Sequence, residues 1–89
     1  MTANDQGPSA ASLLRLRVTM EADPSILPRV LGHFQNLNVT PRQVIAEFGT
    51  SALMHPQIDV CGLSEDRLSL IAAKIGQHPC VLRAYWHQL

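Results

Sequence analysis

The sequence predicts an α+β domain in which a four-stranded antiparallel sheet carries two helices on one face. Three observations support this fold class. Apolar and polar residues alternate over residues 13–20, apolar residues recur with helical spacing over residues 26–37, and a second helical pattern follows at residues 64–76. With the remaining apolar segments, these patterns give the order strand, helix, strand, strand, helix, strand.

The first element is a strand with one apolar face. In "LLRLRVTM", residues 13–20, the even-numbered positions are apolar, and the odd-numbered positions from Arg15 to Thr19 are polar. Successive side chains of a strand point to opposite faces of a sheet. This alternation therefore predicts a strand with one buried face and one face toward solvent or a partner.

The second element is a helix framed by prolines. Pro24 and Pro28 have no backbone N–H and are tolerated only in the first turn, so the helix begins near residue 25 or 26. Asp23 or Ser25 is then the helix cap, and a role as ligand contact is secondary for both. The buried stripe consists of Ile26, Leu27, Val30, Leu31, Phe34 and Leu37.

A hairpin follows this helix. Asn38 can end the helix in a left-handed conformation, and Pro41 favours extended geometry in the residues around it. "RQVIAEF" and "ALMHPQIDVCG" then flank the turn "GTS". Pro56 cannot donate to a strand ladder, so we expect a bulge there, or pairing that is complete only after it. The positions expected to face the core are Val44, Ala46, Phe48, Met54, Ile58 and Val60.

The last two elements are a helix and a strand. Ser64 is expected to cap the helix and Gly76 to end it, while Glu65 and Asp66 favour its positive end. The buried stripe of this helix consists of Leu68, Ile71, Ala72 and Ile75. In the final strand, "CVLRAYWHQL", the residues expected to point inward are Leu82, Ala84 and Trp86.

This order of elements is that of the ferredoxin-like βαββαβ sandwich. Crossover handedness then gives a sheet with the strand order 4-1-3-2 and both helices on one face. Residues 13–89 form this single domain. The preceding "MTANDQGPSAAS", residues 1–12, is small and polar and is expected to be a disordered N-terminal tail.

Composition excludes several functional classes. Seven Lys and Arg balance seven Asp and Glu, which disfavours a nucleic-acid partner. No apolar run approaches the ~20 residues of a membrane span, and the N-terminus lacks the pattern of a signal peptide. The four histidines and two cysteines have no metal-binding spacing. We therefore expect a cytoplasmic protein without metal, other cofactor or membrane partner.

Base stacking and catalysis are also disfavoured. The positions expected on the outer face of the sheet include Arg15, Arg17 and Asp59. An RNA-binding sheet would need aromatic residues on the central strands of this face, and none is present. Arg83 is expected to lie beside the two arginines. No nucleophile elbow, phosphate loop or paired acid spacing is present, so the chain is not expected to be an enzyme. Cys61 and Cys80 are read as small buried residues, with a redox pair as the minor alternative.

The sequence resembles ACT domains over roughly residues 13–87. "DPSILPRVLGHF" resembles the first helix of that family, and its "RVL" followed by Phe34 is the most specific part. "LNVTPRQV" resembles the turn into the second strand, and "IDVCGLSEDRLSLIAAKIGQHPCVLRAYW" resembles the rest of the domain. The likeness is greatest to short single-ACT proteins such as the small regulatory subunit of acetolactate synthase.

The resemblance implies a regulatory domain that pairs side by side and binds an amino acid at the dimer interface. By position, the implied ligand-binding residues are Asp23, Pro24, Ser25, Ile26 and Leu27 before and within the first turn, and Asn38, Val39 and Thr40 at the second strand. Free N–H groups at a helix start favour a carboxylate. Because the prolines remove such donors, we expect weak or no affinity for free amino acids.

Two functions follow from these expectations. The first is a non-catalytic regulatory domain that dimerises, takes a small branched-chain amino acid, and modulates a catalytic subunit such as that of acetolactate synthase. The second is a structural or protein-interaction module of the same fold without a ligand. In both, Arg29 is expected to brace the loop before the helix or a partner chain.

Overall fold

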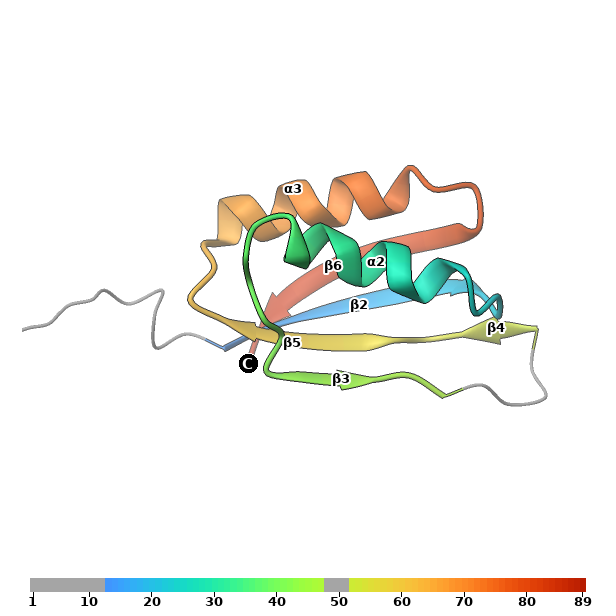
Figure 1. The fold of residues 1–89 in the computed structure, drawn as a ribbon, viewed down its shortest axis with the longest axis horizontal. Helices are drawn as coiled ribbons and strands as arrows, with labels where there is room; N and C mark the ends of the chain where they lie inside the picture. Colours follow the sequence, from blue (N-terminus) through green and yellow to red (C-terminus); the bar gives the residue numbers. More distant parts are fainter. Residues whose placement is uncertain (1–12, 48–51) are drawn as a thin grey trace, which may run out of the picture.

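The computed structural model describes residues 13–47 and 52–89. Its seven elements form one sheet with two helices on the same side (Figure 1). The predicted tail (residues 1–12), Phe48 and the whole predicted turn "GTS" lie outside the described residues. The elements are β2 (Leu13–Glu21), α2 (Ile26–Gln35), β3 (Gln43–Ile45), β4 (Leu53–Met54), β5 (Gln57–Cys61), α3 (Glu65–Gly76) and β6 (Val81–Gln88).

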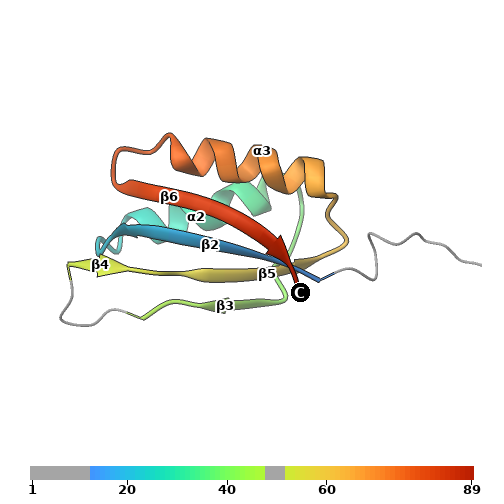
Figure 2. The same cartoon turned by 180° about the vertical axis from the view of Figure 1, so that it is seen from behind.

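The sheet is antiparallel throughout, with β2 at its centre. One side of β2 pairs with β6, and the other side pairs with β5 and, beyond it, with β4. Within the described part of the chain, β3 pairs with β5 alone and forms the edge opposite β6. Figure 2 shows β6 in front of β2 and β3 at the far edge of the sheet. Counting β4 and β5 as one interrupted strand, the order is 4-1-3-2. The predicted fold class is confirmed.

The third strand is divided because Pro56 interrupts it. β4 ends before His55 and β5 begins at Gln57, so the two pieces flank the proline. Pro56 donates no N–H, but its carbonyl accepts a hydrogen bond from the N–H of Val18 at 3.1 Å. The expectation of complete pairing only after Pro56 is confirmed.

The core lies between the sheet and the two helices. The four apolar residues of β2, from Leu14 to Met20, are fully buried, as the alternation predicts. α2 contributes Ile26, Val30 and Phe34 to this core, and the whole predicted stripe of α3 is buried with them. The indole N–H of Trp86 on β6 donates to the Ser69 hydroxyl of α3 at 2.8 Å, which ties the last strand to the helix above it.

The ends of the helices follow the predicted signals. The Ser64 hydroxyl accepts a hydrogen bond from the N–H of Arg67 at 3.2 Å, which caps α3. Asn38 has φ = 58° after the last turn of α2, so it is the left-handed stop. Gly62 has φ = +75° where the chain leaves β5 for α3, a conformation that other residues adopt only with strain.

Three inward positions were predicted wrongly. Leu37, predicted in the buried stripe of α2, lies beyond the last residue of that helix and is 37% exposed. In β6, Met20 pairs with Val81 but Thr19 pairs with Arg83, so Leu82 is the extra residue of a β-bulge. The bulge turns Val81 inward and leaves Leu82 60% exposed. Val44 has the inward parity of β3, but no helix covers that edge, and the side chain is 39% exposed.

Candidate functional site

The loop between β2 and α2 is closed by its own aspartate. The Asp23 carboxylate oxygen Oδ1 accepts hydrogen bonds from the N–H of Ser25 at 2.9 Å and from its hydroxyl at 2.8 Å. The Asp23 carbonyl accepts from the N–H of Ile26 at 3.0 Å. Two of the backbone donors at the helix start are therefore already engaged. Ser25 is the N-cap residue of α2 but makes no side-chain cap bond, and the Asp23 carboxylate instead binds the N–H and hydroxyl of Ser25.

The prolines remove further donors from the same loop. Pro24 and Pro28 have no N–H. Of the three residues between them, Ser25 and Ile26 donate their N–H groups to Asp23, and Leu27 does not. The Ile26 side chain is buried in the core, and that of Leu27 packs partly against it. This helix start is therefore poorly equipped to hold a ligand carboxylate, in spite of the helix dipole.

Charged groups surround the loop. Hydrogen bonds from the N–H and hydroxyl of Ser25 hold the pKa of Asp23 below its usual value, and the nearby Arg29 and His78 act in the same direction. The Arg29 guanidinium lies 3.3 Å from Nε2 of His78, in the turn between α3 and β6. Arg29 thus contacts the turn between α3 and β6, and its role in bracing the loop before α2 or a partner chain stays a prediction. Desolvation and the carboxylate of Glu21 raise the pKa of the half-buried Cys80 thiol, which disfavours the reactive thiolate.

The second group of predicted residues lies at the other end of α2. Asn38, Val39 and Thr40 line an open groove together with residues of α2 and Pro41, at the start of the path to β3. Val39 packs partly against the core, and its N–H donates to the Phe34 carbonyl at 3.0 Å. The ten residues of α2 span ~15 Å at ~1.5 Å per residue. A single chain therefore does not bring the two groups together.

The uncovered face of the sheet carries a paired charge. Asp59 on β5 lies directly across from Arg15 on β2. Its carboxylate oxygens accept from Nε of Arg15 at 2.8 Å and from Nη2 at 2.9 Å, a bidentate geometry. Asp59 is only 3% exposed although it has the outer parity. The hydrogen bonds from Arg15 hold the pKa of Asp59 below its usual value against the opposing effect of burial.

The other arginines of this face also have local partners. Nε of Arg17 donates to Nε2 of His87 at 3.1 Å. The guanidinium of Arg83 lies 4.5 Å from the ring centroid of Tyr85, a cation–π distance. The predicted arginine group therefore forms three separate pairings along β2 and β6.

The two cysteines lie at opposite ends of the sheet. Cys61 pairs with Leu13 at the start of β2, while the Cys80 carbonyl accepts from the N–H of Glu21 at the end of β2. The eight steps from Leu13 to Glu21 span ~26 Å at ~3.3 Å per residue, so the two thiols do not form a redox pair. Within residues 13–47 and 52–89, no three metal-binding side chains converge, and no helix is long and apolar enough to cross a membrane.

Comparison with known proteins identifies the family. A family profile described as an ACT-like domain matches residues 7–89. The chain belongs to this family. The predicted ACT-type resemblance is thereby confirmed at the level of the family. No curated protein sequence matches the ACT-like domain significantly.

Solved structures show the same fold at low identity. The ACT-like domain is similar to the C-terminal domain of the MgtC protein from Mycobacterium tuberculosis, at 14% identity and a TM-score of 0.72, over 98% of this chain and 94% of that one. It is also similar to the ACT domain of GTP pyrophosphokinase from Chlorobium tepidum, at 12% identity and a TM-score of 0.70, over 84% of this chain and 96% of that one.

A third similar structure is a homoserine dehydrogenase from Thiobacillus denitrificans, at 13% identity and a TM-score of 0.73. The match covers 88% of the ACT-like domain but only 17% of the dehydrogenase chain. At these identities the likeness establishes the fold alone.

Sequence reasoning missed one feature of the ACT-like domain. A groove between α2 and α3 is lined on the α3 side by Arg67, Leu70, Ile71 and Lys74. Their spacing of three, four and seven residues is visible in the sequence as a stripe beside the buried one. Only the placement of α2 shows that this stripe borders a groove.

Proposed function

We propose that this ACT-like domain is a non-catalytic regulatory module that pairs with a second copy of itself and acts on a partner enzyme. The observation that carries this proposal is the separation of the two predicted ligand-binding groups, which lie at opposite ends of α2. A two-fold axis beside α2 would place Asp23 to Leu27 of one copy near Asn38 to Thr40 of the other. The ligand site is then a property of the pair.

The edge strand β3 supports this pairing. Among residues 13–47 and 52–89, its one neighbouring strand is β5. Val44 and Ile45 lie on opposite faces of β3 and are 39% and 42% exposed. An edge with unpaired backbone groups and exposed β-branched side chains favours pairing with another strand. Side-by-side pairing would form one continuous eight-stranded sheet and cover both residues.

The ligand that fits this arrangement best is a branched-chain amino acid bound weakly. The groove around Val39 and Thr40 combines the aliphatic side chains of Leu31 and Val39 with the polar side chains of Gln35 and Asn38. At the other half-site, Asp23 engages the donors that a ligand carboxylate would use. A second candidate function, an interaction module without ligand, is favoured by this same engagement.

The interaction partner is proposed from the resemblance alone. Because the "DPSILPRVLGHF" segment resembles the first helix of ACT domains such as the small subunit of acetolactate synthase, the catalytic subunit of that enzyme is the first partner to test. Co-purification and a change in its inhibition by valine would support this assignment. No change in either would direct the search to other enzymes of amino-acid metabolism.

The pairing is tested by sedimentation of the full chain. We expect a dimer at micromolar concentration and a shift to monomer in Ile45→Lys. Leu82→Lys is the matched control, because Leu82 is an exposed leucine on the opposite edge strand and should leave the dimer intact. A wild-type chain that sediments only as a ~10 kDa monomer at high micromolar concentration contradicts the proposal.

Ligand binding is tested by titration calorimetry with valine, leucine and isoleucine. We expect dissociation constants no tighter than millimolar for the wild type. In Asp23→Ala, the N–H and hydroxyl of Ser25 become available and a negative charge is lost, so affinity should rise. Absence of heat in both proteins, with an intact dimer, favours the interaction module.

A further inference from the structure

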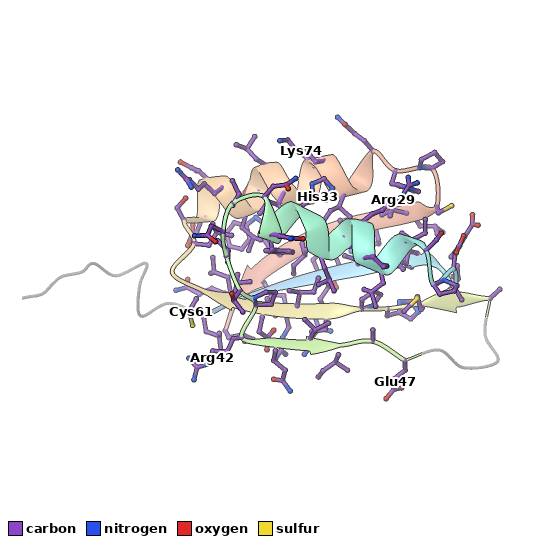
Figure 3. The ribbon with its side chains drawn as sticks, in the orientation of Figure 1. Arg29, His33, Arg42, Glu47, Cys61 and Lys74 are labelled. Carbon is purple, nitrogen blue, oxygen red and sulfur yellow. The ribbon has the colours of Figure 1, made fainter. Side chains whose placement is uncertain are left out.

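The groove between α2 and α3 has a chemical character that the family assignment does not explain. Its α2 side is formed by His33, Asn36 and Leu37, and Figure 3 shows His33 on α2 and Lys74 on α3 above it. Leu70 and Ile71 of α3 supply the apolar part of the lining. Leu70 is 63% exposed, the largest exposure among the large apolar side chains of the described residues.

The charge of this groove is entirely of one sign. Among the described residues that line it, Arg67 and Lys74 are charged and none is acidic. Within the described residues, neither side chain forms an ion pair or a side-chain hydrogen bond. Arg15, in contrast, is fully paired with Asp59. The groove therefore presents two unpaired cations beside an apolar strip.

The size of the groove limits what it can hold. Its volume is ≈190 Å³, whereas pockets that enclose drug-sized ligands measure ~300–1,000 Å³. It is open to solvent along the helices and can take a few side chains of a surface laid across it. This geometry fits a docked segment better than an enclosed small molecule.

The spacing of the cations identifies the segment. Arg67 and Lys74 are seven residues apart on α3, which places them ~10.5 Å apart along the helix axis. Two carboxylates seven residues apart on a facing helix have the same separation, and apolar residues between them would meet Leu70 and Leu37. We propose that this groove docks an acidic amphipathic helix of another protein, with Asp or Glu at i and i+7 and Leu or Ile at i+3 and i+4.

A second copy of this chain fits the groove less well. If two α3 helices paired antiparallel about Leu70, Lys74 would face Asp66 of the other copy, and Arg67 would face Ala73. One of the two cations would stay unpaired at each end. The acidic residues of α3, Glu65 and Asp66, are adjacent and cannot supply the spacing of seven.

The test uses a synthetic helical peptide of 15 residues in an alanine and glutamine background, with Glu at i and i+7 and Leu at i+3 and i+4. It is titrated into the ¹⁵N-labelled full chain, and amide shifts are followed by NMR. We expect saturable shifts confined to α3 and the C-terminal half of α2, with affinity that falls as salt is raised. No shift at millimolar peptide overturns the proposal.

Charge reversal then tests the contacts. The double variant Arg67→Glu and Lys74→Glu should bind the peptide about tenfold more weakly, equivalent to ~1.4 kcal/mol for two exposed ion pairs turned into repulsions. A peptide with Lys in place of both Glu should regain affinity for this variant. Thermal unfolding checks that it is folded, and Arg67→Gln with Lys74→Gln is the milder second variant.

Arg83→Glu is the control variant, because Arg83 is an exposed cation on the other face of the sheet. It should leave peptide binding unchanged, and an equal loss in this control overturns the proposal. Shifts of the groove amides that depend on protein concentration without peptide would assign the groove to a second copy and likewise overturn it.

Discussion

Replacement of Asp59 by asparagine tests how the uncovered face of the sheet is stabilised. The carboxylate is 3% exposed and accepts two hydrogen bonds from the Arg15 guanidinium, at 2.8 and 2.9 Å. The asparagine side chain would have the same size but no charge. Its amide group would also turn one acceptor into a donor that faces an arginine, which can only donate.

The expected loss of stability is ~2 kcal/mol. Hydrogen bonds to charged groups contribute ~1.5–3 kcal/mol, against ~0.5–1.5 for neutral ones, and a buried donor left unpaired costs a further ~1–3. Because the Arg15 side chain is 22% exposed, solvent screening favours the lower part of the combined range. For a domain of this size, each kcal/mol lowers the melting temperature by ~4–8 °C. We therefore expect Asp59→Asn to melt ~8–16 °C below the wild type at pH 7.

The pH dependence distinguishes this effect from a general packing defect. The bonds from Arg15 depress the pKa of Asp59 in the folded state, so its stabilisation is present above the unfolded value of ~3.9. This stabilisation is lost as pH falls through the lower folded value. The difference between wild type and Asp59→Asn should therefore be constant near neutrality and shrink below pH ~4. A difference that is independent of pH would refute the charge-based explanation.

Thermal and urea unfolding followed by circular dichroism are the assays, at one fixed protein concentration because pairing also stabilises. Glu47→Gln is the control, since it removes the same charge from an exposed residue and should change stability by less than ~0.5 kcal/mol. The double variant Arg15→Met and Asp59→Leu should recover most of the loss, because it leaves no unpaired buried charge. An Asp59→Asn protein as stable as the wild type would refute the reasoning.

Three further predictions follow from individual contacts. Ser64→Ala removes the hydroxyl that caps α3 and should cost ~1 kcal/mol in urea unfolding, whereas Ser64→Asp should retain the stability. Val81→Ala should cost ~1–2 kcal/mol because the bulge turns Val81 inward, whereas Leu82→Ala should change the unfolding midpoint little; the reverse order would show that the bulge is absent in solution. Oxidation of dilute protein should give no intramolecular Cys61–Cys80 disulfide by mass spectrometry, since the residues lie at opposite ends of β2.

The patterns of apolar residues predicted the fold because the spacing of apolar residues shows which face of a strand or helix is buried. The alternation in β2 and the stripe of α3 survive unchanged, and Pro56 interrupts its strand for the covalent reason that it lacks an N–H. The alternation of inward and outward side chains no longer predicts burial where a β-bulge interrupts the strand. Because Leu82 is the extra residue of the bulge, Val81 points inward in its place. Both residues are apolar, so the sequence does not show that a bulge lies between them.

The pattern of apolar residues in a strand does not show whether a helix covers that strand or which side chains pair across its outer face. Val44 has the inward parity, yet whether a helix lies above β3 depends on the length and angle of α2. Asp59 has the outward parity, yet its burial results from the Arg15 side chain laid across it. At the candidate site, the family resemblance supplied the residues. The engagement of the Ser25 N–H by Asp23 required coordinates, because a cap and a ligand contact use the same residue types.

The central place of β2 has a consequence for the order in which the chain can fold. The first described strand pairs along its length with the last one, so that Leu14 meets Gln88, and the Leu89 N–H donates to the Leu13 carbonyl at 3.0 Å. These contacts close loops of more than seventy residues and are formed late. During synthesis on the ribosome, one edge of β2 stays unpaired until β6 has left the ribosome. Truncation of even a few residues at the end of β6 should therefore impair the folding of the whole domain.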